Sequence, residues 1–151
     1  MKLPFRRNAG EEKKVRLNLK YSPTPENARK LADVVVLAAR NVSGENLDYS
    51  VGSLAAVDKI IEGFRSEGLA AAQIAETLFS FGCYVGEVFV AQAGGAWRVT
   101  AETSMAPFAN APMVVELGPD HFSNPIDKVF KRLQNGPEDS LPYFYQVMTA
   151  S

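Results

Sequence analysis

The sequence has few of the residues on which most metal and acid–base sites depend. Its 151 residues include one cysteine, Cys83, and one histidine, His121. A single cysteine cannot form an internal disulfide, and a single histidine cannot supply the paired ligands of a common zinc site. Neither a glycine-rich dinucleotide loop nor a Walker motif is present. The sequence therefore predicts no metal, no cofactor and no catalytic residue, and it favours a protein that is not an enzyme.

An excess of charge of one sign is also missing, and so is a long apolar run. The 16 basic residues nearly balance the 17 acidic ones, which argues against nucleic acid as a partner. The purest apolar run, VVVLAA at 34–39, is far shorter than a membrane span. No apolar segment of signal-peptide length follows the basic N-terminus. We therefore expect a cytoplasmic protein without membrane association.

The chain divides into a charged N-terminal segment and one domain. Residues 1–22 contain charge runs such as EEKK at 11–14 and show no clear periodicity. They predict a flexible or loosely attached arm, with a short strand at 15–19, and an interaction tail is the functional alternative. Residues 23–151 are predicted to form a single α+β domain, because no linker or internal repeat interrupts them.

Three helices are predicted in the first two thirds of this domain. Thr24 and Pro25 mark the start of the first. An apolar stripe from Leu54 to Phe64 forms the second, which ends near Gly68. The third runs from Ala71 to the glycine pair at 94–95, through FGCYVGEVFVAQAGGAW at 81–97. Its β-favouring residues leave a strand at 83–91 as the alternative, but length and spacing favour the helix.

Three short strands and two more helices follow. The strands are expected at Ala96–Glu102, at Met113–Leu117 and around His121. A cap and proline at 124–125 open a helix that ends at the Asn-Gly pair 135–136, and the last helix begins at 139 or 140. This order predicts an α+β fold, in which a short antiparallel sheet of about three strands packs with about five helices.

Glu87 is the most conspicuous candidate for a functional side chain. It is a lone carboxylate in an apolar run, and burial there would raise its pKa unless a cation or hydrogen-bond donors compensate. No second acid or nucleophile lies near it in the sequence, and His121 is too distant to be oriented locally beside Cys83. The favoured interpretation is a structural anchor, paired with a cation of the C-terminal helix or with a backbone donor. Binding of a ligand or partner is the alternative.

Basic and aromatic side chains complete the candidate binding residues. A basic face on the fourth helix could grip an anion, although charges that compensate the helix dipole explain it equally well. Aromatic side chains could line a partner groove or pack in the core. The candidate ligand- or partner-binding residues are Glu87, Trp97, Lys128, Lys131, Arg132 and Tyr84.

Four phrases occur in an order that resembles a widespread family of small bacterial domains of unknown function. They are LDYS at 47–50, FGCYVGEVFVAQAGGAW at 81–97, MVVEL at 113–117 and NPIDKVFKRLQNGPEDSLPYFY at 124–145. The resemblance covers roughly residues 45–148, and it implies no established activity. The chain departs from the family pattern at Cys83, where a small residue is expected, and in a longer segment before the second strand.

Together these observations predict a small bacterial, cytoplasmic, non-enzymatic module that binds another protein, of an accessory or immunity type. The alternative is a domain that binds a small molecule or anion in a pocket formed by Glu87 with Lys131 and Arg132. The sequence leaves open whether the protein forms a homo-oligomer.

Overall fold

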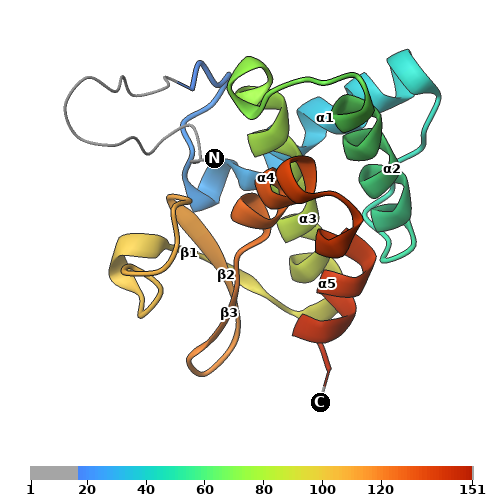
Figure 1. Cartoon of the computed structure of the whole chain (residues 1–151). Helices are drawn as coiled ribbons and strands as arrows, with labels where there is room; N and C mark the ends of the chain where they lie inside the picture. Colours follow the sequence, from blue (N-terminus) through green and yellow to red (C-terminus); the bar gives the residue numbers. More distant parts are fainter. Residues whose placement is uncertain (1–16, 151) are drawn as a thin grey trace.

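Helices and strands follow one another in the predicted order within residues 17–150, the part of the chain that the structure, a computed structural model, describes (Figure 1). These residues form five α-helices and one antiparallel sheet of three strands, as predicted for a single α+β domain. The helices are α1 Ala28–Ser43, α2 Ser53–Ser66, α3 Ala75–Ala93, α4 Pro125–Asn135 and α5 Leu141–Met148. The strands are β1 Ala96–Val99, β2 Met113–Gly118 and β3 His121–Ser123.

The central element is α3, which confirms a helix rather than a strand at 83–91. Every residue from Leu78 to Phe89 is buried, as expected for a helix that is covered on all sides. Two glycines let neighbours approach its backbone. A Cβ on Gly82 would lie 2.6 Å from Cα of Ile126 in α4, and a Cβ on Gly86 would overlap the ring of Trp97. The glycine spacing therefore positions α4 and β1 against one helix.

Two predicted boundaries were wrong by three or four residues. The third helix begins at Ala75 rather than Ala71, because residues 71–73 form a separate 3₁₀ turn. The first strand ends at Val99, although it was predicted to reach Glu102. Thr100 ends the strand because its hydroxyl donates to the carbonyl of Ala111 at 2.7 Å and its side chain turns inward.

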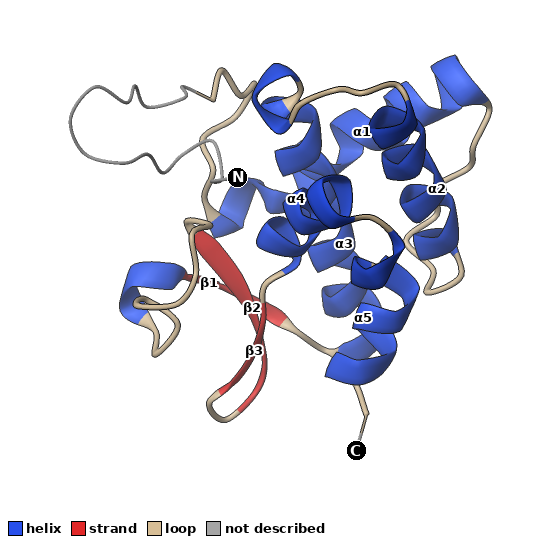
Figure 2. Ribbon diagram, in the orientation of Figure 1, coloured by secondary structure: helices blue, strands red, loops and turns tan. Residues whose placement is uncertain are grey.

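The sheet is a simple meander at one side of the helices (Figure 2). Ala96 pairs with Glu116 and Val99 with Met113, so β1 and β2 are antiparallel. β2 and β3 pair next to each other, and the turn between them places Asp120 at a φ of 54°. The face of β2 towards the helices carries Met113 and Val115, which are both fully buried.

The N-terminal segment contributes to the domain earlier than expected. Residues 1–16 lie outside the described part of the chain, and with them most of the predicted arm. Within the remainder, Leu17, Leu19 and Tyr21 are partly buried against the core, and residues 17–19 do not form the predicted strand. Residues 17–21 therefore pack against the domain, and the boundary at residue 23 stays a prediction.

Candidate functional site

Glu87 is held inside the fold by two partners. Its side chain is buried, with 8% of the residue exposed. The indole N–H of Trp97 donates to Oε2 at 2.9 Å, and Nη1 of Arg29 lies 3.8 Å from Oε1. The expected ion pair is present, but its cation comes from α1 and not from the C-terminal helix, because α5 contains no Lys or Arg. Glu87 thus joins α1, α3 and β1.

The guanidinium of Arg29 links Glu87 to a second cluster. It lies 3.8 Å from the ring centroid of Tyr49, whose hydroxyl donates to Oδ1 of Asp33 at 2.6 Å. Burial opposes the charge of Arg29, yet Tyr49, Asp33 and Glu87 together raise the pKa of the guanidinium above its ordinary value. Burial is also the main reason why the pKa of Tyr49 is raised. Both groups keep their neutral-pH protonation states, so the cluster is a fixed structural element.

Residues 47–50, the LDYS motif, contact Tyr84 of α3 next to this cluster. Tyr49 has a φ of 65° and stacks on Tyr84, with ring centroids 4.6 Å apart. The hydroxyl of Tyr84 accepts the Tyr49 N–H at 2.8 Å and lies 2.6 Å from Oγ of Ser53. Ser50 accepts the N–H of Ser53 at 3.1 Å and so starts α2. Tyr84 is fully buried, so it has no exposed atom with which it could contact a ligand or partner at the surface.

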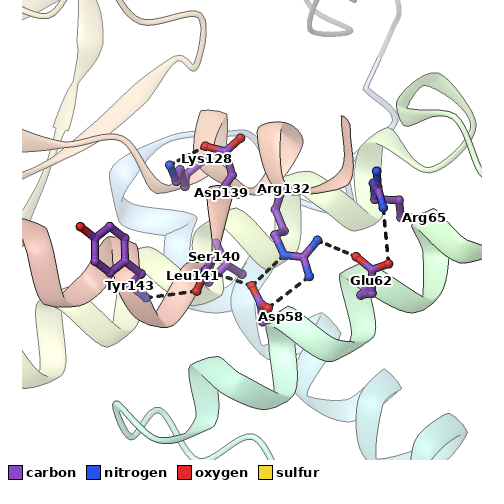
Figure 3. A network of polar contacts seen from close by, with 9 residues as sticks. All are labelled: Asp58, Glu62, Arg65, Lys128, Arg132, Asp139, Ser140, Leu141 and Tyr143. Atoms are coloured by element: carbon purple, nitrogen blue, oxygen red, sulfur yellow. Dashed lines mark hydrogen bonds and ion pairs between the residues drawn. The ribbon is translucent and has the colours of Figure 1, made fainter. Parts of the chain in front are cut away.

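Arg132 is the centre of a separate network between α2, α4 and α5 (Figure 3). Its Nε donates to Oδ1 of Asp58 at 2.9 Å, and its Nη1 to Oε1 of Glu62 at 2.8 Å. The N–H of Leu141 also donates to Asp58, at 2.9 Å. The hydrogen bond from Arg132 is the main reason why the pKa of Glu62 is lowered. Only 2% of Arg132 is exposed.

The other basic residues of α4 have different surroundings. Nζ of Lys128 lies 2.7 Å from Oδ1 of Asp139 and above the ring of Phe144, whereas Lys131 is exposed. Glu87 and Arg132 thus have different internal partners. The pocket predicted between Glu87 and the pair Lys131 and Arg132 stays a prediction. The sequence alone does not show that Arg132 will meet the carboxylates of α2 or that Lys128 will meet Asp139.

The two residues that could have formed a thiol–imidazole pair lie in different surroundings. Cys83 is fully buried, and burial, together with Glu87, raises the pKa of its thiol. His121 is exposed, with Nε2 3.0 Å from the carbonyl oxygen of Met148. Across residues 17–150, no group of three or more His, Cys, Asp or Glu side chains is placed to hold a metal ion. In the same residues, no helix is both long and apolar enough to cross a bilayer.

The structure contains a groove that the sequence did not predict. It has a volume of about 600 Å³ and lies between α1, α2 and the first turns of α3, closed at one side by residues 18–20. None of the six predicted binding residues lines it. Its apolar lining consists of Leu19, Leu31, Val34, Val35, Ala38, Ala39, Val42, Ile60, Phe64 and Phe81.

A few polar groups interrupt this lining. The hydroxyls of Thr77 and Ser80 lie on the α3 wall, and no hydrogen bond from either is present within residues 17–150. The carboxylates of Glu67 and Glu76 and the ammonium of Lys20 also border the groove. One signal in the sequence could have revealed it. Helix α1 has apolar residues at Leu31, Val35 and Ala39 and a second row at Val34, Ala38 and Val42, which is more than one buried face requires.

Comparisons of the chain with protein-family models, with curated proteins and with solved structures gave no match. The family resemblance of the sequence motifs therefore stays a prediction. Fold and site together define an α+β domain with an internally paired polar core and an apolar groove between three helices.

Proposed function

We propose that this protein is a non-enzymatic, cytoplasmic module that binds another protein, of the accessory or immunity type, and that the groove between α1, α2 and α3 is its binding site. The observation that carries the proposal is exposed apolar surface at the groove and beside it. Val34 and Val42, which line the groove, are 39% and 86% exposed, and Leu37, next to the groove on α1, is 58% exposed. An apolar patch of this kind, bordered by charged residues, is typical of a protein interaction site.

The polar clusters support the same proposal because they fix the helices that form the groove. Glu87, Tyr84 and Arg132 are each hydrogen-bonded to another residue inside the fold, so these side chains stabilise the scaffold. A scaffold fixed in this way holds α1 and α3 in place around the groove. Rigid presentation lowers the entropy that a binding site loses when it captures a partner.

The proposal can be tested with a photo-crosslinking amino acid at a single position of the full chain, expressed in the cells that make it. At Ala38, which lines the groove and is exposed, we expect one dominant protein adduct, and a one-to-one complex with the same protein on copurification. The matched control is Ala55, an exposed alanine of α2 outside the groove lining. No protein adduct at Ala38, or the same adducts at both positions, would contradict the proposal.

A further inference from the structure

The groove suits an occupant whose backbone N–H and C=O groups are hydrogen-bonded to one another. Apart from residues 18–20, its lining within residues 17–150 lies on or directly after helices, whose backbone N–H and C=O groups are largely paired within the helix, and none of the three strands borders it. The polar side chains on the α3 wall are the hydroxyls of Thr77 and Ser80 and the carboxylate of Glu76, which already accepts the N–H of Asn18. An extended peptide would bury unpaired N–H and C=O groups here, at a cost of roughly 1–3 kcal/mol each. A helix avoids this cost, because its backbone bonds are internal.

The dimensions also fit a helix. The lining residues of α1 run from Leu31 to Val42. This distance along α1 is about 16 Å at the helical rise of 1.5 Å per residue, or roughly three turns. An amphipathic helix placed beside α1 could insert side chains at steps of three and four residues between α1 and α2. It would also cover Leu37, which lies outside the groove lining and which a small molecule inside the groove would leave in water.

The carboxylates at the border of the groove determine which charged side chains such a helix should carry beside its apolar face. Within residues 17–150, no cation lies within ion-pair distance of Glu67 or Glu76, and Glu76 accepts only the backbone N–H of Asn18, at 2.8 Å. Among residues 17–150, Lys20 is the only cation in the lining. Residues 17–150 as a whole carry fifteen acidic and ten basic side chains. The groove therefore favours basic over acidic side chains on an approaching segment.

We propose that the partner contributes an amphipathic helix of about three turns, whose apolar face fills the groove and whose Lys or Arg side chains flank that face and meet Glu67 and Glu76. This inference rests on the proposed function and specifies the partner's chemistry. Binding is expected to weaken with salt, because the acidic rim lies at the surface, while the apolar contacts persist.

The test uses three synthetic 15-residue helical peptides with the same leucine face, flanked by lysine, glutamine or glutamate. Affinity for the full chain is measured by fluorescence anisotropy at low and high salt. We expect the lysine peptide to bind at least tenfold more tightly than the glutamate peptide at low salt. The double variant Glu67→Gln, Glu76→Gln should reduce this difference to about twofold, and its amide oxygens can still accept the Asn18 N–H. Ala38→Arg should abolish binding, whereas the control Ala55→Arg should not.

Other outcomes separate failure of the inference from failure of the proposed function. If all three peptides bind equally and Ala38→Arg abolishes their binding, the charge preference is wrong but the groove remains a protein-binding site. If no peptide binds while 1-decanol raises the melting temperature in an Ala38-dependent manner, the groove takes a small apolar ligand and both proposals fail. Dimerisation that Ala38→Arg abolishes, seen by sedimentation velocity, would identify a second copy as the occupant and would overturn the inference.

Discussion

At the residue scale, Gly86 has the strictest requirement in the fold. The ring of Trp97 occupies the space that a Cβ at this position would need, and the glycine lies in the fully buried part of α3. Gly86→Ala should therefore destabilise the protein by about 1–3 kcal/mol, the usual cost of overpacking a core. Urea denaturation would measure the change in the free energy of unfolding.

Gly63 provides the matched control for this substitution. It is an exposed glycine within α2, and a Cβ there would meet no atom within 4 Å. Gly63→Ala should stabilise the protein by up to about 1 kcal/mol, since alanine is the better helix former. If both glycines respond alike, the contact with Trp97 does not explain Gly86.

The hydrogen bond between Trp97 and Glu87 gives a second prediction at this scale. Trp97→Phe removes the indole N–H that donates to the buried carboxylate, and should cost about 1–3 kcal/mol. Glu87→Gln removes the charge next to Arg29 but keeps an acceptor for the indole. A double-mutant cycle over the two substitutions should give a coupling energy of at least about 0.5 kcal/mol. Additive effects would show that the two side chains do not stabilise one another.

At the scale of elements, Arg132 connects three helices through two carboxylates of α2 and the start of α5. Arg132→Met keeps much of the side-chain volume but leaves Asp58 and Glu62 without their cation. Because both carboxylates are partly exposed, water relieves part of the penalty, and we expect a loss of about 2–3 kcal/mol. The same denaturation measurement checks this value.

Lys131 is the natural control, since it is the exposed neighbour of Arg132 on α4. Lys131→Met should change the free energy of unfolding by less than about 0.5 kcal/mol. Equal losses from both substitutions would mean that the helix, rather than the network in Figure 3, determines the effect.

The loop between β1 and β2 is attached to α4 by a buried carboxylate, which predicts a pH dependence. Oδ2 of Asp127 accepts the N–H of Asn110 at 2.8 Å and the amide of Asn124 at 2.6 Å. Burial nevertheless raises the pKa of Asp127 above its ordinary value. The native state therefore holds this proton more tightly than the unfolded state does. The resulting stabilisation is present below the ordinary pKa of about 3.9 and is lost as the pH rises through the raised value.

Asp127→Asn removes this titration, so its stability relative to the unsubstituted protein should increase from pH 4 to pH 7. Asp48→Asn should change in the opposite direction and mainly below about pH 4, because hydrogen bonds from Ser50 lower the pKa of Asp48 and this stabilisation is lost as the pH falls through the lowered value. Thermal unfolding in a pH series would measure both. A stability difference for Asp127→Asn that does not vary with pH would contradict the role of burial.

Local signals predicted most elements because they act within a few residues. Asn124 and Ser140 cap α4 and α5 as their sequence positions indicate, and Gly94 ends α3 with a φ of 70°. Contacts between elements that are distant in the sequence could not be predicted in the same way. The partner of Glu87 is Arg29, and which of several cations meets a buried carboxylate depends on how the helices pack. The groove was missed for the same reason, since three helices must be placed before a space between them exists.

At the scale of the whole molecule, the polar clusters and the groove have complementary roles. The Glu87 and Arg132 networks connect α1, α3 and β1 on one side and α2, α4 and α5 on the other. The groove lies between α1, α2 and α3, where both networks hold the walls. Substitutions in the networks should therefore lower stability, whereas substitutions at exposed groove positions should lower binding and leave stability nearly unchanged.

The most direct test of the groove as the binding site is an NMR titration of the isotope-labelled full chain with the lysine-flanked peptide. We expect chemical-shift changes and intermolecular contacts to concentrate at five residues that line the groove, Val34, Ala38, Val42, Ile60 and Phe64. Changes centred instead on the exposed Phe108 or Tyr143, or no changes at saturating peptide, would contradict it.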